Sequence, residues 1–360
     1  AGIATVNALV GGSAFAVAPA TVTLTESPKP SISDLKISFD KIKVGEKLKA
    51  TYAFHDNGGN SEDKSVYVWG HQGETAGRVG ISTETISESG QVPVHEITND
   101  DIAKVVEIAV LPKNGIGLTG DIVKDELRIW SLGIKKVRTI EKHSYDYPPT
   151  IYYPHVGFTG AKFALLTEND DPSLYHWSSD AGPAVSIEVQ DKSVQVSMTG
   201  KPTQREVTIT GQSKDGKDKV VYKYQIARWY YKAGHGDIYG ARSACKGGSR
   251  LPNLVDIFGT KNLKFISDGT AGHREYGLSD SFTRGVGTLF SEFDSKTIMV
   301  LTSNWHSFVD ANGMTSDGAP LDVAAYDGVT SLYFYGSGLV LALKDEGGSY
   351  YAQLCVVDLY

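Results

Sequence analysis

Apolar and polar residues alternate with a period of two in short stretches along most of this chain. The first stretch, LKISF, places Leu35, Ile37 and Phe39 on one face. A second alternating stretch follows at 48–54, and further strand candidates lie at 66–69, 105–111 and 126–130. Because successive side chains of a strand point to opposite faces, these stretches predict the strands of an Ig-like β-sandwich. We assign this sandwich to residues 27–132 and treat residues 1–26 as an N-terminal strand or linker.

The same pattern repeats over residues 133–230, which we predict to form a second Ig-like sandwich. Strand candidates lie at 163–166, 174–177, 185–189, 194–198, 207–210 and 220–226. Trp69 in the first sandwich and Trp177 in the second each follow a tyrosine by two positions. Both are therefore candidates for the buried tryptophan that an Ig-like core carries on a central strand.

Residues 231–360 differ from the rest, because helical periodicity is seen here beside strand patterns. We predict a helix over 237–245 and a second short helix over 254–258, capped by Asn253. Strands are predicted at 297–302, 331–334, 340–343 and 352–357, which makes this domain α+β. Almost no linker follows Trp229, so we expect a buried, rigid joint with the second sandwich.

Composition, charge and the absence of known motifs exclude several functional classes. The 360 residues carry a net charge of −7 and are 41% hydrophobic, which describes a globular chain. The mild acidity argues against nucleic-acid binding, which needs concentrated Lys and Arg. No Gly-x-Ser-x-Gly elbow, dinucleotide fingerprint or paired-histidine zinc motif is present, so we predict no enzyme, no cofactor and no metal.

Cys245 and Cys355 are the two cysteines of the chain. An even count in a chain with the composition of an exported protein predicts one disulfide between them. The alternative is a pair of reduced, buried thiols in a cytosolic protein. A bridge would close a loop of roughly 110 residues and stabilise the fold by about 4–5 kcal/mol in the chain-entropy model.

Several motifs resemble known families. A helix ending in a cysteine, then Gly-Gly, Arg-Leu-Pro, a second helix and a last strand with the partner cysteine resembles a C-type lectin-like domain. These features lie at 241–245, 247–248, 250–252 and 353–357. In the first sandwich, VGEKLKATYAFHD, SVYVWG and ITNDDIAKVVEIAVLPKNGIGLTG are similar to repeats of the intimin/invasin family. Two Ig-like domains followed by a lectin-like domain with one disulfide also resemble the extracellular tip of that family.

The resemblance implies a bacterial surface adhesin with a role in virulence. It would be the passenger of an inverse autotransporter, located extracellularly at the bacterial cell surface and anchored in the outer membrane through a membrane barrel absent from this chain. The lectin-like domain would bind a host cell-surface protein receptor, and the Ig-like domains would act as a rigid spacer. Two alternatives stay open. One is a calcium-independent carbohydrate-binding module that binds a glycan, and the other is self-association through Ig-like edges in aggregation or biofilm.

Five residues are candidates for receptor binding. Tyr335 and Tyr350 are flanked by Gly and Ser, as in binding loops, although they could instead cover a thin core. Trp305 offers another ring, and Asp268 and Asp280 could supply loop carboxylates.

Other features limit which ligands this domain would take. Invasin-like integrin binding depends on acidic residues near the tip, but here the stretch after the helix cysteine, 246–250, is basic and no Arg-Gly-Asp occurs. The calcium motifs of sugar-binding lectin domains are absent as well. The acidic stretches 62–63, 99–101 and 168–171 could bind loop calcium or serve as solvated turns.

Overall fold

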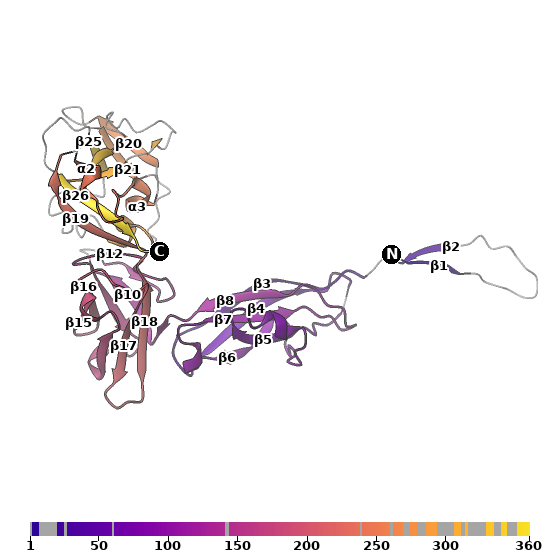
Figure 1. Ribbon diagram of the computed structural model, residues 1–360. Coiled ribbons are helices and arrows are strands. Elements are labelled where there is room, and N and C mark those ends of the chain that lie inside the picture. The colour runs from indigo at the N-terminus through magenta and orange to yellow at the C-terminus, as the bar shows by residue number, and fades with distance from the viewer. Residues whose placement is uncertain are drawn as a thin grey trace, which may run out of the picture. The chain divides into compact units, whose positions relative to one another are not determined.

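The computed structural model describes residues 2–6, 20–24, 27–59, 61–140, 144–237, 240–259, 262–268, 274–278, 286–293, 306–310, 314–315, 329–334, 340–343 and 351–360. The chain divides into two compact units (Figure 1). The first unit holds residues 1–40 and 45–128, and the second holds residues 41–44 and 129–360. The fold is mainly β, as the alternation predicts. Among the described residues, no helix is both long and apolar enough to cross a membrane.

Two three-stranded antiparallel sheets form the body of the first unit. One sheet has the order β3 (Ser31–Ser38), β4 (Lys47–His55), β6 (Gln91–Glu96), and the other has the order β5 (Val66–His71), β7 (Val105–Leu111), β8 (Val123–Arg128). A hairpin of β1 (Gly2–Val6) and β2 (Ala20–Leu24) precedes them. The connections carry helix α1 (Ala76–Val79) and the 3-10 helix η1 (Asn99–Asp101). Thr98 is the N-cap residue of η1.

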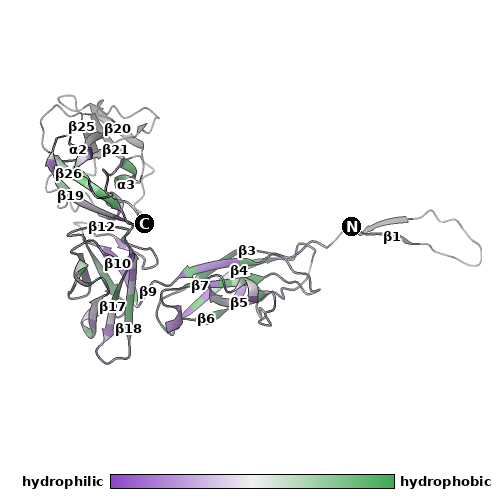
Figure 2. Ribbon diagram, in the orientation of Figure 1, coloured by the Kyte–Doolittle hydropathy of each residue, from purple (hydrophilic) through white to green (hydrophobic). Residues whose placement is uncertain are grey.

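Strand β7 is buried on both faces, and this organises the first unit. Its Ala109 joins Val66, Val68 and Val79 in a small apolar cluster that includes helix α1. Ile108 points to the opposite face, as neighbouring residues in a strand must, and it is also fully buried. Figure 2 shows apolar and polar segments alternating along the strands of this unit.

The prediction that Trp69 and Trp177 are core residues of central strands is wrong. Trp69 lies on β5 and Trp177 lies on β14 (Tyr175–Ser179), and each of these is the outermost strand of its sheet. Both indoles are only partly buried. Each donates its Nε1–H to a proline carbonyl, that of Pro93 at 2.8 Å or that of Pro172 at 2.9 Å. An edge position leaves one side of a large ring open to solvent, while smaller apolar residues fill the centre.

The second unit begins with the second sandwich. Its five-stranded sheet has the order β11 (Asp146–Tyr147), β10 (Ile134–Thr139), β13 (Lys162–Thr167), β16 (Val194–Met198), β15 (Val185–Val189). Its four-stranded sheet has the order β14, β17 (Glu206–Ser213), β18 (Lys219–Gln225), β9 (Ser131–Leu132). The 3-10 helices η2 (Pro172–Leu174) and η3 (Gly182–Ala184) lie in its connections. The six strand candidates of this region are confirmed to within a few residues at their ends.

The rest of the second unit, residues 228–360, is here called the third domain. It is built on a sheet with the order β12 (Val156–Phe158), β19 (Arg228–Gly236), β26 (Tyr351–Asp358), β22 (His306–Asp310), β24 (Val329–Phe334), β25 (Val340–Leu343), β21 (Arg274–Leu278), β20 (Asn262–Asp268), β23 (Met314–Thr315). Three short helices accompany it, α2 (Ala241–Ala244), α3 (Leu254–Phe258) and α4 (Leu289–Glu292). Strand β12 comes from the sequence of the second sandwich, yet it pairs in parallel with β19.

Most of the local predictions for the third domain are confirmed where the structure describes them. Helix α3 begins at Asn253 with a capping box, and the strands predicted at 331–334, 340–343 and 352–357 are present. The helix predicted over 237–245 is shorter, covering Ala241–Ala244, with 238–239 outside the described residues. The strand predicted at 297–302 also lies outside them. The lectin-like assignment and the domain boundaries stay predictions.

Candidate functional site

The five candidate receptor-binding residues fall almost entirely outside the described part of the chain. Tyr335, Tyr350, Trp305 and Asp280 lie outside it. Asp268 is the last residue of β20, where its backbone is in register with Arg274 of β21. Their role in receptor binding therefore stays a prediction. What the structure does describe is the base of the third domain, which holds that domain against the second sandwich.

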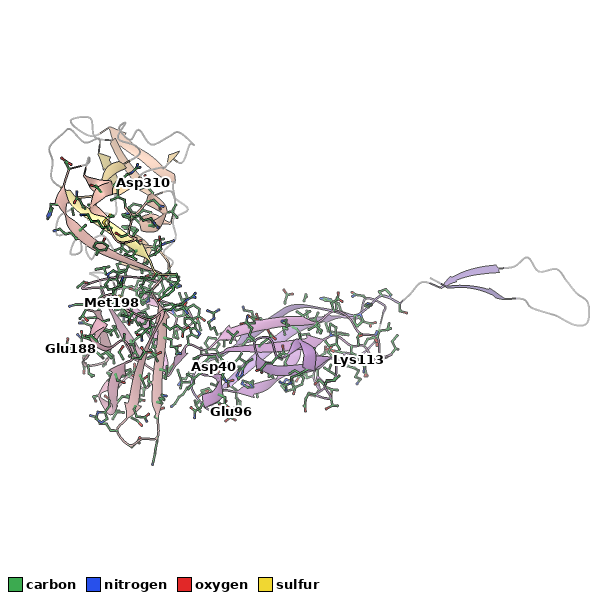
Figure 3. The ribbon with its side chains drawn as sticks, viewed as in Figure 1. Asp40, Glu96, Lys113, Glu188, Met198 and Asp310 are labelled. Carbon is green, nitrogen blue, oxygen red and sulfur yellow. A yellow bond between two sulfur atoms is a disulfide. The ribbon has the colours of Figure 1, made fainter. Side chains whose placement is uncertain are left out.

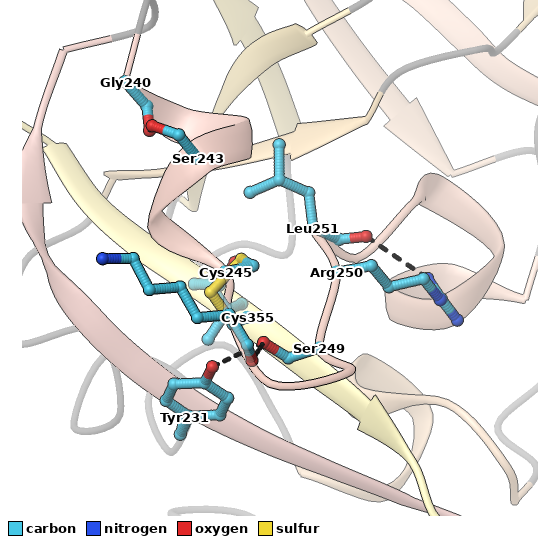
Figure 4. The surroundings of a disulfide bond; sticks show 10 residues. Tyr231, Gly240, Ser243, Cys245, Ser249, Arg250, Leu251 and Cys355 are labelled. Atoms are coloured by element: carbon cyan, nitrogen blue, oxygen red, sulfur yellow. Dashed lines mark hydrogen bonds between the residues drawn. A yellow bond between two sulfur atoms is a disulfide. The ribbon is translucent and has the colours of Figure 1, made fainter.

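The predicted disulfide is confirmed at this base (Figure 4). Cys245 and Cys355 are bonded with an S–S distance of 2.00 Å. Cys245 directly follows helix α2, and Cys355 is fully buried in β26. The bridge thus ties the loop after α2 to the strand beside β19. The same loop is fixed again by Arg250, whose N–H donates to the carbonyl of Val356 at 3.0 Å.

A cluster of two arginines and two aspartates lies next to the disulfide loop. Arg250 donates to both oxygens of Asp256, with the shorter distance 2.5 Å, and to Asp358 at 2.9 and 3.1 Å. Arg228 Nε lies 3.4 Å from each of the two carboxylates. Hydrogen bonding to Arg250 lowers the pKa of the Asp358 carboxyl below its ordinary value, against the effect of partial burial. The buried Asp256 also accepts the Asn253 N–H at 2.8 Å and so fixes the start of α3.

One apolar core runs from the second sandwich into the third domain. Tyr153 and Phe158 of the sandwich sequence contact the ring of Phe293, with centroids 5.9 and 5.1 Å apart. Met198, which is labelled in Figure 3, belongs to the same core. Gly157 is required here, because a Cβ at that position would lie 2.8 Å from the Trp229 ring. The buried joint expected after Trp229 is present, and it is larger than a short linker alone implies.

Glu292 is a fully buried carboxylate at the centre of this joint. It accepts three backbone N–H groups, those of His155 at 2.8 and 2.9 Å, Val156 at 3.0 Å and Gly287 at 2.7 Å. Its own carbonyl accepts the hydroxyl of Tyr153 at 3.0 Å. A side chain of the third domain, that of Glu292, therefore accepts the backbone N–H groups at the start of β12, a strand that comes from the sandwich sequence.

The carboxylate of Glu292 interacts electrostatically with His155 and Tyr222. His155 Nδ1 lies 3.4 Å from Glu292 Oε1, an ion-pair distance when the imidazole is protonated. Burial, with a smaller contribution from Glu292, raises the pKa of Tyr222 well above its ordinary value. The Tyr222 hydroxyl stays neutral and donates to the Tyr153 carbonyl at 2.6 Å. Together these groups form a polar centre inside an apolar joint.

Sequence reasoning missed Glu292. It lies in LFSEF, where Leu289 and Phe293 are buried on either side of it. A glutamate flanked by apolar residues at helical spacing was the available signal. A buried carboxylate is costly unless it is hydrogen-bonded, so such a position indicates partners elsewhere in the chain.

Several carboxylates of the acidic stretches considered for calcium have protein partners. Asp63 accepts the Tyr52 hydroxyl at 2.6 Å, and Asp171 caps η2 by accepting the Ser173 N–H. Asp170 pairs with Lys135. Within the described ranges, no three His, Cys, Asp or Glu side chains are grouped so that they could hold a metal ion.

The buried Asp101 of the first unit shows the same use of a carboxylate. His71 Nε2 lies 2.8 Å and His95 Nε2 lies 3.0 Å from its two oxygens, and the Thr98 N–H donates at 2.9 Å. Burial on its own would raise the pKa of Asp101, but these hydrogen bonds outweigh it and lower the pKa below the ordinary value. These hydrogen bonds hold the loop around η1 in place.

Comparison with known proteins gives one family match and several structural likenesses. Residues 138–224 match the model of invasin domain 4. The crystal structure of invasin, described as a bacterial integrin-binding protein, is 19% identical with a TM-score of 0.42, and the alignment covers 99% of this chain and 66% of that one. This chain thus spans slightly less than two thirds of that protein. A titin structure, A168–A169, is 12% identical with a TM-score of 0.18 and covers 56% of this chain and 100% of that one.

Proposed function

We propose that this chain, whose residues 138–224 match invasin domain 4, is an adhesin of the intimin/invasin family and contacts a host cell through its third domain. Bacterial surface adhesion is the general activity of such domains. The finer part of the proposal is that the third domain is lectin-like and binds a host cell-surface protein receptor. The Ig-like sandwiches would then act as its spacer, displayed extracellularly on an outer-membrane anchor.

The observation that carries the proposal is the joint between the second sandwich and the third domain. A receptor-binding domain under load must not swing or detach from its support. Here a shared apolar core and the buried Glu292 carboxylate hold the third domain to the second sandwich, and the disulfide fastens two segments within the third domain itself. Interfaces between domains that move freely are usually smaller and more polar.

The chemical class of the receptor is proposed from the residues around the disulfide loop. Invasin is described as integrin-binding, but that description belongs to invasin. In this chain the loop after Cys245 carries Lys246 and Arg250 instead of acidic residues. We therefore propose a host protein receptor without assigning it to the integrins, and we keep the five candidate residues as its first test.

The experiment compares three purified proteins for binding to cultured epithelial cells, with and without EDTA. These are the full chain, residues 27–128 and residues 129–360. The cut follows the division into two units except for residues 41–44, which stay with the first fragment, because a cut at residue 230 would divide a buried core. We expect residues 129–360 to bind as well as the full chain and EDTA to have no effect. Binding by residues 27–128 alone, or loss of binding in EDTA, would contradict the proposal.

Single substitutions then test the candidate residues. Tyr335→Ala and Tyr350→Ala in the full chain should weaken cell binding. The matched control is Tyr360→Ala, because Tyr360 is 60% exposed and its ring contacts Arg205. Equal binding by all three variants would remove these tyrosines from the receptor site, though not the third domain itself.

A further inference from the structure

A shallow groove lies on the first unit, far in sequence from the third domain. Its volume is about 380 Å³, and one wall is formed by residues of β5, the outermost strand of its sheet. The opposite wall comes from α1 and the residues after it. The groove has both aromatic and polar lining residues, namely Tyr67, Trp69, Arg78, Ser82, Thr83 and Glu84.

The aromatic part of the groove is held in place before any ligand arrives. The Trp69 indole stacks on the His95 imidazole with centroids 5.4 Å apart and an interplanar angle of 27°. Its Nε1–H is already bonded to the Pro93 carbonyl. The indole therefore offers the groove an apolar surface in a fixed orientation, not a hydrogen-bond donor. A rigid, pre-oriented ring loses little entropy when a ligand stacks on it.

Polar groups surround this ring on the same edge. Tyr67 donates its N–H to the Glu84 carbonyl at 3.0 Å, on the side of β5 away from β7. Because alternate residues of a strand direct their backbone groups to the same side, the N–H and C=O of Trp69 also point toward the groove. Gly70 allows the Arg78 guanidinium to lie against the strand, where a Cβ would be 3.3 Å from Arg78 Nη1.

The same geometry disfavours an added peptide strand. Residues 84–86 already pair with the edge of β5 near Tyr67, and the His71 N–H donates to the Glu74 carboxylate. One residue of open backbone edge, at Trp69, is too little for a strand ladder. It is enough for a small ligand that carries several hydroxyl groups.

We propose that this groove binds a short neutral saccharide, with a sugar ring stacked on Trp69 and its hydroxyls bonded to Arg78, Glu84 and the Trp69 backbone. An apolar ring face and a rim of hydroxyls are the two chemical features of a sugar, and the groove presents a partner for each. The guanidinium donates, the carboxylate accepts, and their charges offset one another. This goes beyond the receptor-binding role, because it places a second ligand site on the first unit.

The test uses the full chain and four disaccharides: lactose, cellobiose, maltose and N,N′-diacetylchitobiose. Saturation-transfer NMR at about 10 mM sugar reports binding in the millimolar range. We expect at least one disaccharide to bind, and Trp69→Ala and Arg78→Met each to weaken it by about tenfold. Trp177→Ala is the matched control, because that indole is also half-buried on an edge strand and bonded to a proline carbonyl. It should leave binding unchanged.

Arg78 is exposed, so its substitution tests the groove without disturbing the core. Absence of saturation transfer from all four sugars would overturn the proposal. So would binding that survives both Trp69→Ala and Arg78→Met, or binding that is lost equally in Trp177→Ala. Since the cell-binding test rests on residues 129–360, its failure and the failure of this proposal are separate results.

Discussion

Replacing Glu292 by glutamine should destabilise the second unit by about 2–4 kcal/mol. The carboxylate accepts three backbone N–H groups, and hydrogen bonds to a charged group contribute about 1.5–3 kcal/mol each. Desolvation of the fully buried charge opposes this by several kcal/mol. Glutamine keeps the shape and one acceptor oxygen. Its NH₂ group must face a backbone N–H, which leaves at least one buried donor unsatisfied at a cost of about 1–3 kcal/mol.

The free energy of unfolding of residues 129–360 is measured by urea denaturation, with tryptophan fluorescence and circular dichroism as the two probes. The control is Glu188→Gln, because Glu188 is exposed on the outer strand β15 (Figure 3) and should change stability by less than about 0.5 kcal/mol. Both optical probes should shift together, because Glu292 bonds to residues on both sides of the joint. A change as small as that of the control would refute the reasoning. A shift confined to one of two separate transitions would refute the idea of a shared cooperative core.

Three further predictions concern other parts of the fold. Cys245→Ser should lower the free energy of unfolding of the second unit by up to about 5 kcal/mol, because the disulfide joins residues 110 positions apart. Equal melting temperatures in oxidising and reducing buffer would contradict this. The folded-state pKa of Asp101 is lowered, so its stabilising effect is present above about pH 4 and is lost as the pH falls through the folded value. Asp101→Asn should therefore flatten the acid limb of the first unit's pH–stability curve, and an unchanged curve would count against this role. Gly157→Ala should destabilise the second unit by about 1–3 kcal/mol because the new methyl meets the Trp229 ring, which differential scanning calorimetry would detect.

The period-two alternation was sufficient to locate most strands of both sandwiches. It succeeds where a strand has one buried and one exposed face, as β3 does, because the order of side chains then records which face is buried. The same pattern could not place Trp69, since alternation states which face a residue takes but not whether its strand is central or at an edge. Both tryptophans lie on edge strands, and that is a property of the strand order.

The joint was predicted only in outline. A missing linker after Trp229 indicates contact between neighbouring domains, but it does not reveal what makes the contact. Strand β12 lies some 70 residues before β19 in the chain and pairs with it in parallel. Glu292 follows β12 by well over 100 residues and bonds to its first N–H groups. Such partners are set by topology, and no local pattern in one sequence encodes them.

The position of Glu292 also bears on how an adhesive load would pass through this protein. A pull on the third domain reaches the sandwich along the chain between β18 and β19, and also through β12, which belongs to the sandwich in sequence and to the third domain in its pairing. The carboxylate anchors the N–H groups at the start of β12, while the disulfide fixes β26 on the far side of β19. Part of the load therefore passes through the buried hydrogen bonds of Glu292, while the disulfide keeps two segments of the third domain joined. If the third domain is the receptor-binding element, weakening Glu292 should reduce adhesion under flow more than adhesion at rest, even when the receptor surface is untouched.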